Sequence, residues 1–239
     1  MDLKDKAMAS VVNMLIKYVR KDFDKNAMNL LNLVEKLDVK KVNQTTYDGL
    51  HKALGDKNNN WYRFVKSLAL ETDEGVLKKL VPAALNVAMY SYSKRMESIE
   101  KYNCNVPWAI LMDPTAACNL KCKGCWAAEY GHQSSLSYET LARIIKEGKE
   151  LGTYMYLFTG GEPLVRKADL IRLCEENPDC AFMSFTNGTL CDDAFADELK
   201  RVGNLYLAFS IEGYEDTNDF RRGEGVYKQV VEAMARLKK

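Results

Sequence analysis

Residues 138–176 decide the fold, and they read YETLARIIKEGKELGTYMYLFTGGEPLVRKADLIRLCEE. Apolar side chains recur at helical spacing in Tyr138–Leu151 and again in Lys167–Glu176. Between them, Tyr154–Phe158 is a short, continuous apolar run of the kind found in a buried strand. The stretch therefore predicts a helix, a strand and a second helix in succession.

The same alternation continues on both sides of this stretch. Ser137 is a suitable N-cap for its first helix, and Gly152 is a residue type that ends helices. Repeated strand–helix units predict an α/β fold with a parallel sheet, curved or closed like a barrel. The predicted elements are strand Trp108–Met112, helix Tyr138–Leu151, strand Tyr154–Phe158, helix Lys167–Glu176, strand Phe182–Phe185, helix Asp193–Arg201, strand Leu205–Ile211 and helix Val226–Leu237.

The first hundred residues predict helices only. We therefore expect a helical N-terminal region over residues 1–103 and a partial (βα) barrel core over residues 104–239. Apolar stripes on these helices are typical of core packing, and the alternative is that they shelter a hydrophobic substrate such as a lipid. The first stripe is Leu3, Ala7, Val11, Leu15 and Tyr18, and further helices are predicted around Leu30–Leu37, over Tyr47–Leu54, over Trp61–Leu70 and over Asp73–Glu100, the last with a break or kink at Pro82.

Composition excludes several classes of protein. Hydrophobic residues make up 47% of the 239, so the chain is able to bury a core. With 34 basic and 33 acidic side chains, the charge balance does not favour binding to nucleic acid. The longest apolar stretch, residues 80–90, is too short to cross a bilayer. Seven cysteines without a secretory leader indicate a reducing compartment, and we expect a cytoplasmic protein without a transmembrane segment.

Three of those cysteines form a cluster. Cys118, Cys122 and Cys125 lie within the sequence C-N-L-K-C-K-G-C. Three thiolates can converge on one metal centre, whereas a closed structural site normally takes four protein ligands. The spacing therefore predicts a metal centre with one coordination position left for a molecule that is not protein.

Unusual residues follow all four predicted strands. Because the carboxyl ends of parallel strands meet at one edge of a sheet, these residues are expected to surround a single site. Glycines there allow close approach of the backbone, and polar side chains offer hydrogen-bond donors and acceptors. The four groups are the cysteine triplet, Thr159-Gly160-Gly161-Glu162-Pro163, Thr186-Asn187-Gly188-Thr189, and Ser210-Ile211-Glu212-Gly213 with Asp219, Arg221 and Arg222 on the same loop.

This constellation resembles the radical S-adenosylmethionine (SAM) superfamily. Its C-x3-C-x2-C motif stands at Cys118, Cys122 and Cys125, and its G-G-E-P motif at Gly160–Pro163. Many members have an aromatic residue before the third cysteine, where this chain has Gly124. The resemblance covers residues 107–239, and C-x-G-C together with Gly225-Val226-Tyr227 is most similar to the hopanoid-modifying branch.

The resemblance implies a 4Fe–4S cluster held by the three thiolates, with SAM on the fourth iron. It implies reductive cleavage of SAM to a 5′-deoxyadenosyl radical, which abstracts hydrogen from a substrate. Thiolates are soft anionic ligands that suit clusters of strongly negative potential. A reducing electron donor such as flavodoxin or ferredoxin is implied, with an unknown small-molecule, lipid or peptide substrate.

Roles for individual residues follow from the same resemblance. Gly160, Gly161, Glu162 and Pro163 are expected to contact the methionine part of SAM, with Glu162 accepting from its ammonium group. Ser210 and Arg222 are expected to hold the SAM carboxylate, for which the planar guanidinium is well shaped. Arg221 is expected outside the site. The remaining expected contacts, to ribose, adenine or substrate, are Thr186, Asn187, Glu212, Tyr130 and His132.

Other interpretations are weighed against this one. The cysteine triplet with His132 also fits a Cys3His zinc site, in a zinc-stabilised interaction domain. An iron–sulfur electron-transfer or sensing module that does not cleave SAM is a further alternative. Cys104, Cys174, Cys180 and Cys191 lack ligand spacing and are expected to be buried, inert thiols, with an auxiliary cluster as the alternative.

The predicted barrel is incomplete. The resembled family typically has six strand–helix units, and four are predicted here. We therefore expect that the chain is the N-terminal part of a longer protein and that the last strand is an open edge.

Overall fold

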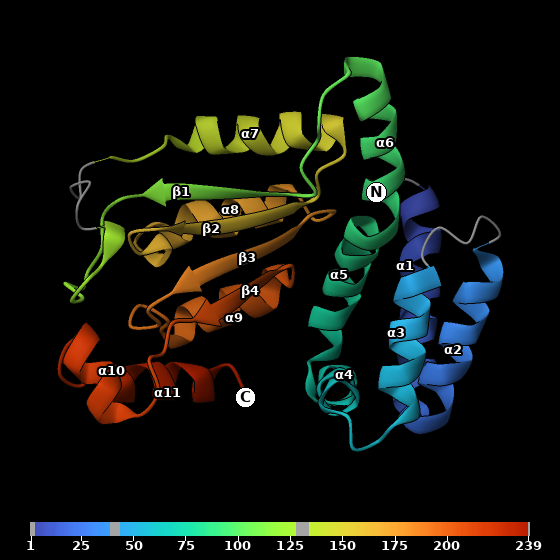
Figure 1. Ribbon diagram of the computed structural model, residues 1–239, viewed down its shortest axis with the longest axis horizontal. Coiled ribbons are helices and arrows are strands. Elements are labelled where there is room, and N and C mark those ends of the chain that lie inside the picture. Colours follow the sequence, from blue (N-terminus) through green and yellow to red (C-terminus); the bar gives the residue numbers. More distant parts are fainter. Residues whose placement is uncertain (1–2, 39–43, 128–133, 239) are drawn as a thin grey trace. The chain divides into compact units, whose positions relative to one another are not determined.

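The computed structural model describes residues 3–38, 44–127 and 134–238 (Figure 1). The chain divides into two compact units, Met1–Lys78 and Lys79–Lys239. This division falls within a helix, earlier in the chain than the boundary predicted at residue 103, so helical residues up to Tyr102 belong to the same unit as the sheet. None of the helices in the described ranges has the length and apolar character needed to cross a membrane.

The first unit is helical, as predicted. Asp22 caps its second helix by accepting a hydrogen bond from the Lys25 N–H, and Asn59 caps its fourth from the Trp61 N–H. These caps satisfy backbone donors that have no partner inside the helix. The helices of this unit are α1 Leu3–Lys21, α2 Phe23–Leu37, α3 Gln44–Gly55 and α4 Asn60–Glu71, with the start of α5 Glu74–Leu85.

The sequence predicts a break or a kink at Pro82, and the helical segment before the sheet continues through this residue without a break. Proline lacks the N–H that would bond to the carbonyl four residues earlier, yet α5 extends to Leu85. The irregularity follows as a π-helical turn, η1 Asn86–Tyr90, before α6 Ser91–Tyr102. Ala83 of α5 is fully buried, and Val87 of η1 packs against the same cluster of side chains.

Four strands of the second unit form a parallel sheet in the order β1-β2-β3-β4 (Figure 1). The predicted α/β class and partial barrel are confirmed, and the sheet of the described residues is open rather than closed. The first strand extends beyond its predicted end at Met112, through an irregularity in its pairing that accommodates Pro114. The strands are β1 Ala109–Thr115, β2 Met155–Gly160, β3 Ala181–Thr186 and β4 Leu205–Phe209.

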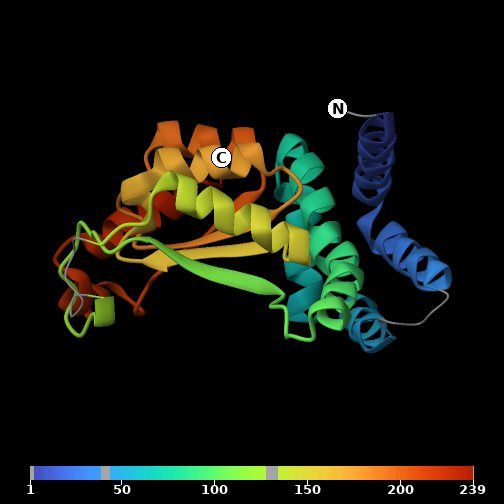
Figure 2. The same cartoon turned by 90° about the horizontal axis from the view of Figure 1, so that it is seen from above.

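Helices α7 Tyr138–Leu151, α8 Lys167–Glu176 and α9 Asp193–Val202 cover one face of the sheet (Figure 2). The predicted bounds of α7 and α8 are confirmed, as are the Ser137 cap and the left-handed Gly152 that ends α7. The core on this face contains a row of stacked rings and the aliphatic side chains of the helices. Its largest buried members are Tyr156, Phe158, Phe182, Leu141, Ile145, Leu164, Leu170 and Leu173.

Among the described residues of this unit, the opposite face of the sheet is covered near the first residues of the strands. There Ala109, Met155 and Ala181 pack with Ala83 and Val87. Farther along the strands, large apolar side chains that alternate with the core residues are exposed. They are Leu111, Phe185 and Tyr206, with Leu111 59% exposed.

The chain after β4 corrects one prediction. The sequence predicted a loop up to Val226, whereas the structure contains a short helix, α10 Glu215–Arg222, before α11 Val226–Arg236. A further short element, the 3-10 helix η3 Pro163–Arg166, follows β2. Both elements lie at the carboxyl edge of the sheet.

Candidate functional site

All the predicted site residues that the structure describes lie at or just beyond the carboxyl ends of the four strands. Parallel strands bring these ends to one edge, where loops from different parts of the sequence meet. Tyr130 and His132 lie outside the described residues. The placed residues are Cys118, Cys122, Cys125, Gly160, Gly161, Glu162, Pro163, Thr186, Asn187, Ser210, Glu212, Arg221 and Arg222.

The three clustered cysteines are free, half-buried thiols on the loop after β1. The Leu120 N–H lies 3.5 Å from Cys118 Sγ, and the Cys125 N–H donates to the Cys122 carbonyl at 3.3 Å. Burial raises the pKa of the Cys122 thiol, and the positive charge of Arg222 acts in the opposite direction. No three Cys, His, Asp or Glu side chains in the described ranges have the geometry to hold a metal ion, so the chemistry of the donors carries the assignment.

The double-glycine turn packs directly against the start of the cysteine loop. The Gly161 N–H donates to the Thr115 carbonyl at 2.9 Å, and the Glu162 N–H donates to the Ala117 carbonyl at 2.8 Å. A Cβ on Gly161 would lie 2.3 Å from the Ala117 oxygen. The space beside this glycine is therefore filled by the protein's own backbone, and its predicted contact with SAM stays a prediction.

Glu162 is the most deeply buried charged residue at this edge, with 1% of its surface exposed. Its Oε1 accepts from the Leu164 N–H at 2.9 Å and from Thr186 Oγ1 at 2.8 Å, and its Oε2 accepts from the Asn187 N–H at 2.7 Å. Burial raises the pKa of Glu162, and these hydrogen bonds act in the opposite direction. The carboxylate therefore joins the loops after β2 and β3, and its bond to the SAM ammonium group stays a prediction.

Asn187 connects the loop after β3 to the cysteine loop. Its Nδ2 donates to Asn119 Oδ1 at 2.9 Å and lies 4.0 Å from Cys118 Sγ. Its Oδ1 accepts from the Thr189 N–H and hydroxyl, and Asn119 in turn donates to the Thr189 hydroxyl at 2.7 Å. The first cysteine is thus held next to a nearly buried amide, which sequence analysis had assigned to ribose or substrate.

Ser210 lies one residue beyond β4, next to the end of β3. Its N–H donates to the Thr186 carbonyl at 2.8 Å, and the side chain is half-buried. The fourth strand therefore delivers this hydroxyl to the same edge as the Glu162 network.

Two arginines of α10 converge on one carboxylate. Glu212 Oε1 lies 2.6 Å from Arg222 Nη2 and 3.0 Å from Arg221 Nη1, and the bond to Arg222 lowers the pKa of Glu212. Arg222 is the more buried, with 14% of its side chain exposed against 42% for Arg221. The Arg221 carbonyl accepts from the Lys123 N–H at 2.8 Å, which joins α10 to the cysteine loop.

Arg222 Nε is buried and has no hydrogen-bond partner among the described residues. A buried donor without a partner costs free energy unless a ligand satisfies it. This donor therefore suits an anionic ligand, and the three thiols are donors of the chemical type that binds iron–sulfur clusters. The prediction placed Arg222 on a loop, and the structure corrects this to the end of α10.

Sequence analysis missed two polar residues at this edge, Asn119 and Asn218, and named a third, Asp219, without giving it a role. Asn119 was passed over because nothing but its place between two cysteines distinguishes it. Asn218 is fully buried and accepts from the Glu212 N–H at 3.2 Å. Asp219 accepts from the N–H groups of Gly225 and Tyr227 at 2.6 and 2.7 Å, and the Tyr227 bond in particular lowers the pKa of Asp219.

The four remaining cysteines lie elsewhere. Cys174, Cys180 and Cys191 are buried, as expected, and burial raises the pKa of each thiol. Cys104 is exposed, contrary to the prediction, because it follows the end of α6 rather than entering the core.

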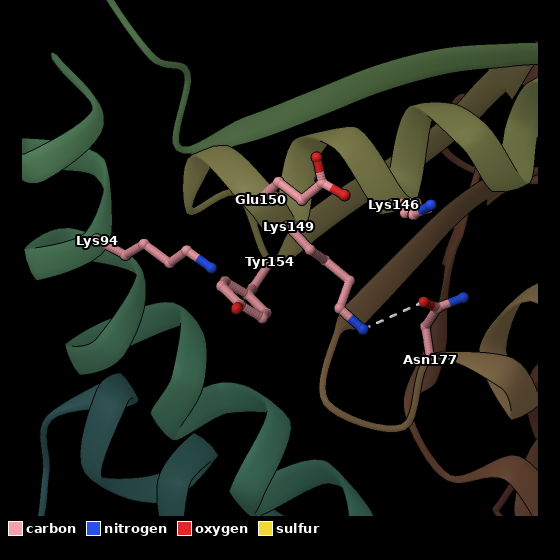
Figure 3. A pocket seen from close by; sticks show the side chains of 6 residues that line it. All are labelled: Lys94, Lys146, Lys149, Glu150, Tyr154 and Asn177. Atoms are coloured by element: carbon pink, nitrogen blue, oxygen red, sulfur yellow. Dashed lines mark hydrogen bonds between the residues drawn. The ribbon is translucent and has the colours of Figure 1, made fainter. Parts of the chain in front are cut away.

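A cavity of about 240 Å³ lies beside the start of β2, at the opposite edge of the sheet (Figure 3). Lys149 reaches across it toward Asn177, with Nζ 3.3 Å from Oδ1, and pairs with Asp179 at 2.7 Å. None of the predicted site residues lines it. Its lining consists of Lys94, Lys146, Lys149, Glu150, Tyr154 and Asn177.

Comparisons with known proteins agree with this geometry. The family model of the radical SAM superfamily matches residues 112–239, more than half of the chain. The Fe-coproporphyrin III synthase of Methanosarcina barkeri is 37% identical over 118 residues, which are 48% of this chain and 29% of that protein. The GTP 3′,8-cyclase of Syntrophomonas wolfei is 36% identical over 122 residues, covering 48% and 36%.

A solved structure shares the fold. SuiB of Streptococcus suis bound to S-adenosylmethionine superposes with a TM-score of 0.50 at 18% identity, over 81% of this chain and 41% of that one. The chain spans about a third of the length of the two curated relatives described above.

Proposed function

Because this chain belongs to the radical SAM superfamily, whose cofactors are a 4Fe–4S cluster and SAM, we propose that Cys118, Cys122 and Cys125 bind the cluster and that the surrounding loops bind SAM. When bound, these two groups supply reductive cleavage of SAM and a 5′-deoxyadenosyl radical that abstracts hydrogen from a substrate. The chain's own residues hold the reactants in place, orient them and exclude competing reactions.

One observation carries this proposal. The loop with the three thiols and the Gly160–Pro163 turn are bonded to each other at one edge of the sheet, through Gly161 and Glu162. Two motifs separated by some forty residues in sequence thus form one surface. A thiolate-bound centre and a ligand held by the second motif would be neighbours there.

Arg222 is the side chain best suited to the SAM carboxylate. Its guanidinium has five N–H donors, of which Nη2 pairs with Glu212 while the buried Nε lacks a partner. Ser210 offers a hydroxyl at the neighbouring strand end. Thr186, Asn187 and Glu212 shape the same edge, through bonds that position their neighbours rather than through free polar atoms.

The substrate would lie over the open face of the sheet. Leu111, Phe185 and Tyr206 are exposed there, on the face opposite the helices. Exposed apolar side chains on this face favour a substrate with apolar surface. The two curated relatives are named for chemistry on a coproporphyrin and on GTP. The electron donor would be a flavodoxin or a ferredoxin.

The test is anaerobic reconstitution with iron and sulfide, followed by dithionite and SAM. Release of 5′-deoxyadenosine supports the enzyme. A reducible iron–sulfur protein that never cleaves SAM would instead be an electron-transfer or sensing module, and a colourless protein with bound zinc would refute both.

A matched pair of variants tests the SAM contact separately. Arg222→Lys removes Nε as a donor and should weaken SAM binding about tenfold or more, since about 1.4 kcal/mol corresponds to a factor of ten. Arg221→Lys, on the more exposed neighbour, should leave the affinity nearly unchanged. Equal losses in both variants, measured by calorimetry on cluster-loaded protein, would contradict the assignment.

A further inference from the structure

The cysteine loop leaves the sheet and returns to it through a narrow neck. Thr115 forms an antiparallel bridge with Ser135, and their hydroxyl oxygens lie 2.8 Å apart. The Ala116 N–H donates to the Ser134 carbonyl at 2.7 Å, and the Leu136 N–H donates to the Pro114 carbonyl at 3.1 Å. The three thiols lie in the sequence between the two sides of this neck.

Arg166 reaches this neck from the end of η3. Its Nη1 donates to the Pro114 carbonyl at 2.9 Å and also to the Leu136 carbonyl. One nitrogen thus bonds to both strands of the neck, which lie more than twenty residues apart in sequence. The side chain is 18% exposed, so water does not compete freely for these bonds.

Asp169 holds the guanidinium in this orientation. Its Oδ2 accepts from Arg166 Nε at 2.8 Å and from Nη2 at 2.5 Å. The two donors on one side of the planar group therefore face the carboxylate, and Nη1 faces the neck. A lysine ammonium has no fixed plane and cannot reproduce both sets of bonds at once.

We propose that Arg166 is a positioning residue that closes the neck of the cysteine loop and so presents the three thiols to the cluster. The inference rests on the proposed function only for the identity of what the loop binds. The hydrogen bonds from Arg166 to the two sides of the neck, here called the Arg166 clamp, are present in the protein without any cofactor.

Arg166→Lys is the central variant, and Arg172→Lys is its matched control. Arg172 lies on α8, is exposed and pairs with Glu176 at 2.9 Å, so its replacement alters an arginine–carboxylate pair away from the neck. Asp169→Asn is the second variant, because it keeps the arginine and weakens only its orientation. If Arg166→Lys does not fold, Asp169→Asn decides the outcome.

The first measurement is hydrogen exchange of the cluster-free protein at the Ala116 and Leu136 amides. We expect protection to fall about tenfold or more in Arg166→Lys, less in Asp169→Asn and not at all in Arg172→Lys, since a lost bond of about 1.4 kcal/mol changes an opening equilibrium tenfold. Unchanged protection in both Arg166→Lys and Asp169→Asn would overturn the proposal. If Arg166 and Asp169 only stabilised α8, the variants would lower overall stability without a specific loss of protection at the Ala116 and Leu136 amides.

The second measurement is iron retained per folded chain after reconstitution. Retention should fall in the same order as protection. If the wild-type protein binds no iron, the proposed function fails. The exchange data still decide whether Arg166 holds the neck closed.

Discussion

At the amino edge of the sheet, Ala109 and Met155 pack against Ala83 in a small cluster of hydrocarbon side chains. At the carboxyl edge, Glu162 and Asn187 sit at the centre of a chain of hydrogen bonds. Apolar contacts have no preferred direction and contribute mainly stability, whereas hydrogen bonds between buried groups fix positions and require every partner. One edge therefore supports the fold, and the other holds loops in register for chemistry.

The strongest test of this contrast is Cys122→Ala. Loss of one of three ligands should abolish cluster binding almost completely, while the free energy of unfolding of the cluster-free protein changes little because the thiol is only half-buried. Iron and sulfide content with visible absorbance measures the first effect, and urea unfolding measures the second. Cys104→Ala, at an exposed thiol, is the control; retention of a normal cluster in Cys122→Ala would remove the ligand assignment.

Met155→Ala tests the amino edge. The side chain is 7% exposed, and its truncation leaves a cavity, so the free energy of unfolding should fall by about 2–4 kcal/mol. Iron bound per folded chain should stay at the wild-type value. Met234→Ala, at an exposed methionine, should cost far less; a variant that is stable but free of iron would contradict the division of roles.

Glu162→Gln tests the carboxyl edge and should have a smaller effect on stability. The amide keeps one acceptor oxygen and turns its NH2 toward a backbone donor, which should cost about 1–3 kcal/mol. Cluster retention should fall as well, because the loops after β2 and β3 lose their shared partner. Urea unfolding measures the loss of stability, and iron analysis measures cluster retention. Glu198→Gln, at an exposed glutamate, is the control. A loss of stability without loss of iron would show that the Glu162 hydrogen bonds do not support the proposed cluster site.

The smallest expected effect is a pH dependence carried by Asp219. The Tyr227 N–H lowers the pKa of this carboxyl, so the folded state binds its proton less readily than the unfolded state does. Its contribution to stability is therefore present above the ordinary aspartate pKa of about 3.9 and is lost as pH falls through the lower folded value. The difference in unfolding free energy between wild type and Asp219→Asn should be constant near neutral pH and shrink in acid. A difference that does not vary with pH would show that the carboxylate charge is irrelevant.

Helices and strands with periodically spaced apolar residues were predictable from the sequence. The bounds of α7 and α8 follow from their caps and apolar spacing, and the strand ends that carry the motifs follow from the parallel topology. The helix α10 was missed because its sequence, EDTNDFRR, has a single apolar residue, and that residue, Phe220, is exposed. Without an apolar face, periodicity gives no signal, and contacts of Asn218, Asp219 and the arginines hold the segment instead.

The positions of the site residues at the strand ends were also predictable, but their hydrogen-bond partners were not. Glu162 was expected to face a ligand, because sequence reveals that a glutamate follows a double glycine but not that Thr186 and Asn187 close over it. Arg166 was passed over because the recognised motif ends at Pro163. Long-range hydrogen bonds depend on how loops meet in space, which spacing along the chain does not encode.

Each strand of the sheet pairs with the strand that precedes it in the chain. A nascent polypeptide leaving the ribosome can therefore add one strand at a time to a neighbour that is already in place. The hydrogen bond from Asn187 to Asn119 on the thiol loop must wait until Asn187 has emerged. If the three thiols bind a cluster as proposed, iron that arrived before then would meet a loop held by only part of its anchoring, and synthesis of the third strand would set the earliest point for productive metal loading.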